Sequence, residues 1–242
     1  MKNNRGYSEV GASFLFFLFA FGVSLAAQVC IVRSIEAGTI ITYNVAGANV
    51  KVPQGGIVEM LPSVIIQADV LVAQEVTPLT FQKVVNALRY SGYLYESCFK
   101  KRGTFNGRII GHAVFSKYPI LTCEAKKFGG RNGDKGMLQI VTIATPWRRY
   151  TLGNYHASPA YAWELWGDIL NVYEDLDIIA GDFNIDIWPY CLKYEGGSAN
   201  PMYHEGDTPI DHVWPRFDEW QAQVMREYTA SDHLPVKAWR VE

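Results

Sequence analysis

The chain has 242 residues, of which 49% are hydrophobic and 14% aromatic, and its formal net charge is −2 at pH 7. This composition excludes an intrinsically disordered protein, because enough apolar side chains are present to form a sizeable core. No linker rich in Gly, Ser or Pro divides the sequence, so one large domain is expected after the N-terminal segment.

The N-terminal segment, residues 1–33, differs in character from the rest of the chain. Two basic residues precede an uncharged run over 10–32, which ends at Arg33. This pattern is typical of an export signal, and small residues around Ala26 favour cleavage there. The run is also long enough to cross a bilayer as an uncleaved anchor, and a buried helix is a third alternative. We expect a signal peptide or membrane anchor, with the folded domain, residues 34–242, secreted, periplasmic or held at a membrane outside the cytoplasm.

Short apolar or alternating runs predict strands over 39–44, 70–74, 108–116, 138–144, 150–156, 177–180, 210–214 and 236–241. Apolar residues at helical spacing predict helices over 79–90, after a Thr77 cap, and over 160–174. A further helix is expected between the first two strands, although Pro53 and Pro62 weaken it. Strands interspersed with helices predict layered sheets with helices outside.

The cysteines indicate the cellular compartment less clearly than the N-terminal segment does. Cys98 and Cys123 flank a predicted hairpin and could form a disulfide, which a location outside the cytoplasm would permit. Buried free thiols are the alternative.

Basic residues are concentrated between positions 100 and 149, where eleven of them oppose two acidic residues. This stretch has a net charge of +9, so the remainder has −11. The side chains could be scattered over two faces of short strands as an ordinary solvated surface. Alternatively, they form a cationic shoulder that holds a polyanion such as nucleic acid. The candidate substrate-binding residues are Lys100, Lys101, Arg102 and Arg108.

Four short acidic and histidine motifs each follow a segment that is predicted as a strand. They are Val-Ala-Gln-Glu ending at Glu75, Gly-Asp-Phe-Asn with Asp182 and Asn184, Ile-Asp-His-Val around Asp211, and Ser-Asp-His-Leu-Pro-Val with Asp232 and His233. Carboxylates at the ends of buried strands converge on one edge of a sheet, where they can bind a hard cation with histidine beside it. The pattern indicates metal-assisted cleavage of a phosphoester.

These motifs, with Asn44 after Ile-Thr-Tyr, the Gly-His-Ala-Val-Phe-Ser segment at 111–116 and His156 in Asn-Tyr-His-Ala-Ser-Pro, resemble in order the endonuclease/exonuclease/phosphatase superfamily. The resemblance covers about residues 39–241, and His-Ala-Ser-Pro is most similar to the deoxyribonuclease I branch. It implies an α+β fold of four layers, in which two packed mixed β-sheets are flanked by helices and the active site lies at one end of the strands.

The resemblance also implies roles for the oxygen-bearing residues. Glu75 would bind Mg²⁺ or Mn²⁺ directly, with Asn44 and Asp232 completing or orienting the shell. Asp182 would orient or deprotonate the attacking water, and Asn184 would hold a phosphate oxygen or the nucleophile.

Two histidines would face the scissile phosphate. The resemblance implies that Asp211 orients His233 and favours its protonated form, and that His156 makes a second contact to phosphate. The second histidine of such a pair usually has an acidic partner of its own, and none is found near Gly111 and His112. His112 is interpreted as structural.

The function expected from these features is that of an exported Mg²⁺-dependent phosphodiesterase, most favourably a nuclease that hydrolyses DNA or RNA by attack of metal-activated water. The alternative is a phospholipid or phosphoinositide phosphodiesterase or phosphatase, and a binding protein on a retired enzyme fold is a third hypothesis. A loop with Trp188, Tyr190 and Tyr194 beside Lys193 suits stacking on unpaired bases or insertion into a membrane interface. A nucleic acid substrate and membrane association through the N-terminal segment are expected, without an obligate protein partner.

Overall fold

The computed structural model describes residues 38–47, 49, 51–129, 135–146, 148–193, 198, 208–216 and 220–241. The chain falls into two compact units, 1–37 and 38–242, and the described residues all belong to the second. The predicted signal peptide or anchor therefore lies outside the described residues. Within the described ranges, no helix is long and apolar enough to span a bilayer.

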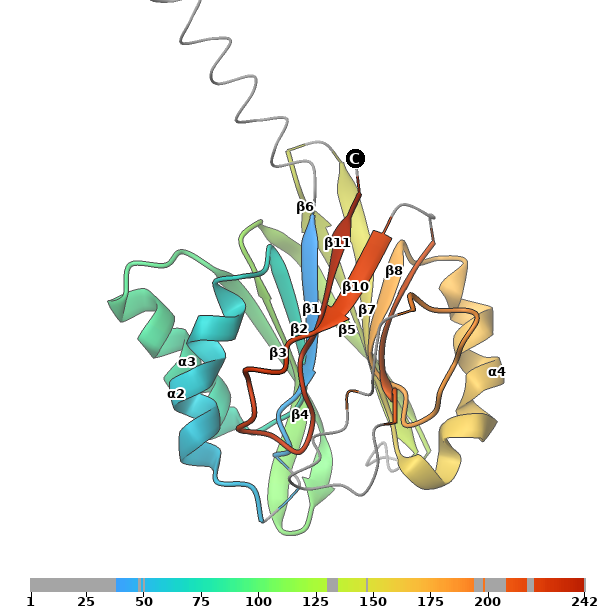
Figure 1. Ribbon diagram of the computed structural model, residues 1–242, viewed down its shortest axis with the longest axis horizontal. Coiled ribbons are helices and arrows are strands. Elements are labelled where there is room, and N and C mark those ends of the chain that lie inside the picture. Colours follow the sequence, from blue (N-terminus) through green and yellow to red (C-terminus); the bar gives the residue numbers. More distant parts are fainter. Residues whose placement is uncertain are drawn as a thin grey trace, which may run out of the picture. The chain divides into compact units, whose positions relative to one another are not determined.

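Two mixed β-sheets form the centre of this unit (Figure 1). The first sheet has the order β10 (Trp220–Val224), β11 (Val236–Arg240), β1 (Thr39–Asn44), β2 (Val70–Val76), β4 (Arg108–Ser116) and β3 (Glu96–Phe105). The second has the order β5 (Ile120–Phe128), β6 (Gly136–Ala144), β7 (Arg149–Ala157), β8 (Ile178–Asp182) and β9 (Asp211–Pro215). Only the pairs β1–β2 and β7–β8 are parallel among the pairs described.

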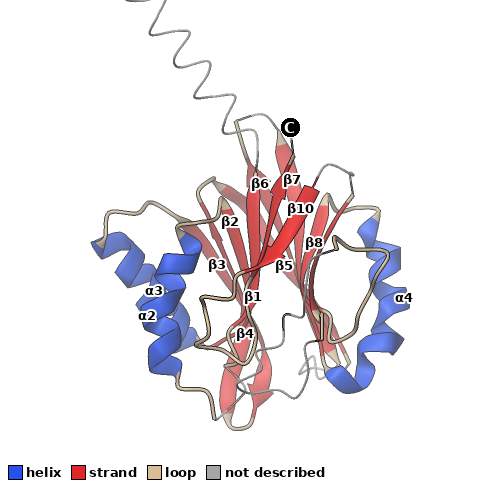
Figure 2. Cartoon of the chain, in the orientation of Figure 1, coloured by secondary structure: helices blue, strands red, loops and turns tan. Residues whose placement is uncertain are grey.

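Helices cover the outer face of each sheet (Figure 2). The helices α2 (Gln54–Ile65) and α3 (Pro78–Tyr90) pack on the first sheet, and α4 (Ala162–Tyr173), which follows the 3-10 turn η1 (Pro159–Tyr161), packs on the second. A third apolar cluster, which includes Val72 and Val141, lies between the two sheets. The predicted four-layer α+β fold is confirmed.

The start of α3 follows from local sequence, whereas α2 depends on packing. Thr77 caps α3 as expected, because its side-chain oxygen accepts a hydrogen bond from Thr80 N at 3.0 Å. The helix α2 contains Pro62, which removes an internal hydrogen bond. Ile57 and Leu61 are nevertheless fully buried against the first sheet, and this packing stabilises a helix of weak intrinsic propensity.

Near one end of the strands, the packing between the sheets becomes polar. Asn154 of β7 donates from Nδ2 to the carbonyl oxygens of Ala73 (3.1 Å) and Ala113 (3.2 Å) in the first sheet. Gln74 of β2 donates in return from Nε2 to Asn154 Oδ1 at 2.8 Å. His112 of β4 is fully buried with Nδ1 3.0 Å from the Asn154 carbonyl oxygen. These contacts join β7 to both β2 and β4.

A disulfide joins the edges of the two sheets. Cys98 on β3 and Cys123 on β5 form it, with their Cα atoms 6.6 Å apart. The sequence placed the two cysteines beside one hairpin, whereas the structure places them on edge strands of different sheets. Cys191 is a buried free thiol.

Candidate active site

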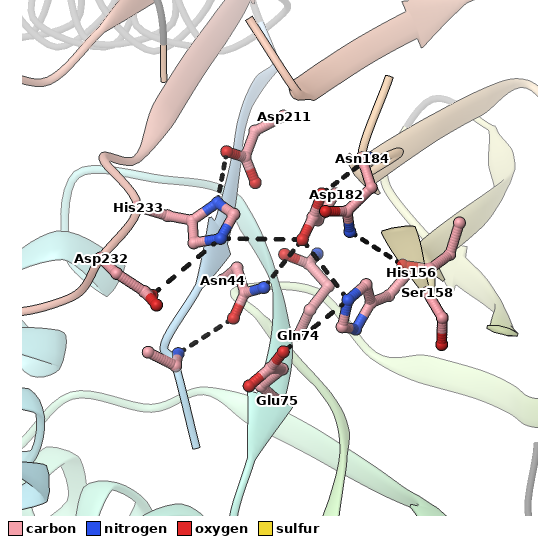
Figure 3. Close-up of polar contacts among 12 residues, drawn as sticks. Asn44, Gln74, Glu75, His156, Ser158, Asp182, Asn184, Asp211, Asp232 and His233 are labelled. Carbon is pink, nitrogen blue, oxygen red and sulfur yellow. Dashed lines mark hydrogen bonds and ion pairs between the residues drawn. The ribbon is translucent and has the colours of Figure 1, made fainter. Parts of the chain in front are cut away.

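Polar side chains from both sheets meet at one end of the strands (Figure 3). The first sheet and its connections contribute Asn44 and Glu75, together with Asp232 and His233 from the segment before β11, and the second contributes His156, Asp182, Asn184 and Asp211. The strand register explains the convergence in the second sheet, because Asp182 pairs with His156 on one side and Asp211 on the other. The structure thus brings together all eight residues that were predicted as catalytic or metal-binding.

Asp182 lies at the centre of this cluster and is 1% exposed. Its Oδ2 accepts a hydrogen bond from Asn44 Nδ2 at 2.9 Å, and its Oδ1 accepts one from the backbone N of Asn184 at 2.9 Å. Burial raises the pKa of Asp182 to about 7; the charge of His233 opposes this shift and that of Asp211 adds to it. A carboxyl group with such a pKa can exchange a proton near neutral pH.

Close backbone packing explains the glycine that precedes Asp182. A Cβ atom on Gly181 would lie 1.9 Å from the carbonyl oxygen of Tyr155, so only glycine allows β8 to approach β7 here. Asn184 has a left-handed backbone conformation, with φ 54°, which asparagine tolerates well. Its side chain donates to the Ala157 carbonyl oxygen at 2.8 Å and anchors the turn after β8.

Glu75 is directed into the site by an irregularity in β2. The pairing of β2 with β4 shifts register between Ala73 and Val76, and Glu75 has φ 55°. A left-handed glutamate is uncommon, and such strain is often found at functional sites. Its Oε1 is 3.8 Å from His156 Nε2. The irregularity therefore takes this side chain out of the regular alternation of the strand.

His233 and Asp211 form a buried pair. His233 Nδ1 is 2.8 Å from Asp211 Oδ2, and His233 Nε2 lies 3.8 Å from Asp182 Oδ2 and 4.0 Å from Asp232 Oδ1. Burial lowers the pKa of His233, but the charges of Asp211 and Asp182 outweigh it and raise the pKa to about 10. His233 is therefore a protonated imidazolium at neutral pH.

His156 has a different environment. Its Nδ1 is 2.8 Å from Arg102 Nη1, and its Nε2 is 3.4 Å from Asp182 Oδ2. Burial lowers the pKa of His156 well below the usual range, and the charge of Arg102 lowers it further. His156 is therefore neutral, and a guanidinium lies where an acidic partner would be expected.

Two site residues were missed by the sequence analysis. Asn49 donates from Nδ2 to Asp232 Oδ2 at 2.8 Å, and Ser231 donates from Oγ to the Asn44 carbonyl oxygen at 2.7 Å. Ser231 belongs to the Ser-Asp-His motif and could have been identified from it, whereas Asn49 lies in a loop without a recognisable pattern.

Two overlapping sets of residues could bind a metal ion. Among the described residues, Asp182, Asp211 and His233 offer ligand atoms within 4.8 Å of one another. His233 Nδ1 is already 2.8 Å from Asp211 Oδ2, and the charges of Asp211 and Asp182 favour the protonated ring, so a metal ion would have to displace a proton to bind Nε2. Figure 3 shows the carboxylates of Glu75, Asp182 and Asp232 on three sides of the Asn44 amide, and oxygen donors of this kind suit a hard cation. We therefore favour the carboxylates over the imidazole as ligands.

The four predicted substrate-binding residues do not form one exposed group. Lys101 is exposed and Lys100 half-buried on the edge strand β3. Arg108 donates from Nη1 to the carbonyl oxygens of Gly47 (3.3 Å) and Asn49 (3.2 Å), so it braces the loop after β1. Arg102 is only 2% exposed, which corrects the expectation that it lies on a surface shoulder.

Known proteins share both the sequence pattern and the fold. A sequence model of the Endonuclease/Exonuclease/phosphatase family matches residues 41–233. A search of curated proteins found no significant match. Truncated TDP2 from Caenorhabditis elegans is similar in structure, with TM-score 0.59 and 13% identity over 85% of this chain and 98% of that one. So is an endonuclease/exonuclease/phosphatase family protein from Bacteroides thetaiotaomicron, with TM-score 0.63 and 16% identity over 85% and 98%. TDP2 from D. rerio, complexed with single strand DNA product, has TM-score 0.61 and 15% identity over 84% and 98%.

Proposed function

The chain belongs to the endonuclease/exonuclease/phosphatase family, and we propose that it is a Mg²⁺-dependent phosphodiesterase that cleaves nucleic acid outside the cytoplasm. Membership of this family makes it a metal-dependent phosphoester hydrolase. The observation that carries the proposal is the buried Asp182, with one neutral and one protonated histidine within 4 Å of its Oδ2.

Each residue has a separate role in the proposed phosphodiester hydrolysis. Asp182, held by Asn44, orients the attacking water and accepts its proton. His233 stabilises the charge that develops on the phosphate and can donate a proton toward the leaving oxygen. A Mg²⁺ ion held by Glu75 and Asp232 would polarise the phosphoester and neutralise part of its charge.

The arrangement of basic side chains favours a polyanionic substrate. On the second sheet Lys127 pairs with Met137, Met137 with His156 and His156 with Asp182, so one row of residues leads from the edge strand β5 to the site. Lys126 and Lys127 on β5 and Lys101 on the adjacent edge strand β3 are exposed. Cations along an edge next to the reacting phosphate suit flanking phosphates of a nucleic acid.

Export is supported by the Cys98–Cys123 disulfide, because such bonds persist mainly in oxidising compartments. It agrees with the export signal expected in residues 1–33.

The direct test uses the full chain with supercoiled plasmid and RNA, in Mg²⁺ or in EDTA. We expect hydrolysis that requires the metal, and a fall of about 10²–10⁴-fold in Asp182→Asn, because a general base contributes that much. Asp175→Asn is the matched control, since Asp175 is exposed after α4. Full activity in EDTA, or equal activity of Asp182→Asn and the control, would contradict the mechanism.

A lipid phosphodiesterase is the second candidate, and one surface feature favours it. Trp188 and Tyr190 are each 56% exposed after β8, and the Lys193 ammonium lies 5.7 Å from the Trp188 ring centroid. Tyr194 lies outside the described residues. An aromatic pair with a cation suits a membrane interface as well as unpaired bases. Release of water-soluble phosphate from sphingomyelin or phosphoinositide liposomes, reduced in Trp188→Ala while plasmid cleavage is absent, would favour this alternative.

A further inference from the structure

Arg102 is a buried cation in direct contact with an active-site histidine. We propose that Arg102 is a positioning residue that fixes the ring proton of His156 on Nε2, so that this histidine meets the phosphate as a neutral hydrogen-bond donor. The consequence for the reaction rests on the proposed function, whereas the position of the proton does not.

A bulge in β3 places the guanidinium between the sheets. Lys101 pairs with Gly111 of β4, and the next pair is Gly103 with Ile110, so Arg102 is an extra residue without a partner in the ladder. Such a bulge redirects a side chain, here to a site where it is 2% exposed.

Contacts on several sides hold Arg102 in this position. Its Cζ lies 5.0 Å from the Phe105 ring centroid, and its carbonyl oxygen accepts a hydrogen bond from Lys127 Nζ at 2.7 Å. Its Nη2 donates to Ser158 Oγ at 2.5 Å, while Nη1 lies 2.8 Å from His156 Nδ1. The guanidinium fork therefore spans two residues at the end of β7.

The chemistry of arginine decides which histidine nitrogen bears the proton. A guanidinium has five N–H donors and no acceptor, so His156 Nδ1 must be the acceptor. A neutral imidazole has one proton, which is then on Nε2. That nitrogen faces Asp182 Oδ2 at 3.4 Å and Glu75 Oε1 at 3.8 Å, so its N–H points to where the phosphate would bind.

The two active-site histidines thus have opposite hydrogen-bonding roles at Nδ1. Nδ1 of His233 faces the carboxylate of Asp211 and donates, whereas Nδ1 of His156 faces a guanidinium and accepts. His156 can donate a hydrogen bond to a phosphate oxygen but has no second proton to release. Proton delivery therefore falls to His233, and Arg102 replaces the acidic partner that a second acid would need.

The first test reads the proton directly by ¹⁵N NMR of the histidine rings in the metal-free full chain, with the His156 resonances assigned by comparison with His156→Gln. We expect Nδ1 of His156 to have the shift of an unprotonated nitrogen and Nε2 that of a protonated one. A protonated Nδ1 would overturn the proposal. This readout does not depend on any substrate, so a chain without nuclease activity would refute the proposed function and leave the proposal on Arg102 standing.

The second test asks whether Arg102 acts through His156. Arg102→Met should lower kcat by about 10²-fold with little change in KM, because one preorganised donor loses its orientation. In a His156→Gln background the same substitution should cost less than about threefold, since coupled residues are not additive. Arg102→Lys should recover part of the loss because its ammonium retains N–H donors. Lys83→Met, which removes an exposed cation on α3, is the control for charge. Equal losses in both backgrounds would show that Arg102 has only a structural role.

Discussion

Removing two exposed lysines at the basic edge tests whether the substrate is a nucleic acid. Lys126 is three strands from Asp182 in the second sheet, which is about 14 Å at the usual spacing between strands. That distance corresponds to about four phosphates along one strand of a duplex, so Lys126 can contact only flanking phosphates. Lys101 pairs with Gly111 of β4, which pairs with Val76 of β2, so it lies two strands, or about 10 Å, from the position next to Glu75. We expect the double variant Lys101→Gln/Lys126→Gln to bind long DNA more weakly without a change in turnover at saturation.

The size of the effect on DNA binding can be measured from the salt dependence of the affinity. Each lost phosphate contact removes about 0.9 from the log–log slope on duplex DNA and about 0.7 on a single strand, so two contacts remove about 1.8 or 1.4. Fluorescence anisotropy of a labelled oligonucleotide between low and moderate salt measures this slope. The matched control is Lys117→Gln/Arg148→Gln, which changes the charge equally at the opposite end of the strands. Equal slopes for both variants and the wild type would refute the reasoning and leave the lysines as a solvated surface.

Three further predictions follow from the site. Glu75→Gln should lose most turnover and recover part of it at high Mg²⁺, measured against the same titration of the wild type; a loss without any rescue would place Glu75 outside the metal shell. Asp211→Asn combined with His233→Ala should cost little more than His233→Ala alone, and multiplicative losses would mean that Asp211 acts elsewhere. Burial lowers the pKa of His112 to about 3, so the stability that this neutral ring contributes is complete above pH 6.5 and is lost as pH falls toward 3. Between pH 7 and 4, the free energy of unfolding of His112→Gln should therefore fall by roughly 3 kcal/mol less than that of the wild type. Urea unfolding of the metal-free protein measures this difference. An identical fall in both proteins would contradict the assignment.

The central strands could be predicted because buried strands contain runs or alternations of apolar residues. The strands β1 and β4 were predicted with their observed bounds, and most of their residues are buried. The three strands that were not predicted, β3, β5 and β10, are all edge strands of the described sheets. Edge strands expose more of their residues and commonly contain charged side chains, which removes the apolar alternation that identifies a strand. The fourth edge, β9, was predicted because four of its five residues are buried.

The site residues, like the strands, could be predicted only where a local sequence pattern identifies them. Asp182 ends β8, Asp211 begins β9 and His233 shortly precedes β11, each within a short motif, so these residues could be predicted from the sequence. The contact of Arg102 with His156 depends on a bulge in one sheet and on the packing of that sheet against the other, and neither has a local sequence signature. A count of charges consequently assigned Arg102 to a surface that it does not reach.

The polar contacts between the sheets explain how a site divided between them keeps its geometry. Apolar faces alone would tolerate small shifts of one sheet against the other, because dispersion and burial are not directional. Asn154 instead makes hydrogen bonds to Ala73 and Gln74, directly before Glu75, and it lies two residues before His156. A shift that moved His156 away from Glu75 would break these buried bonds, and each unsatisfied group would cost about 1–3 kcal/mol. Polar side chains in this part of the core therefore fix the relative position of the two sheets at the level where the reaction requires it.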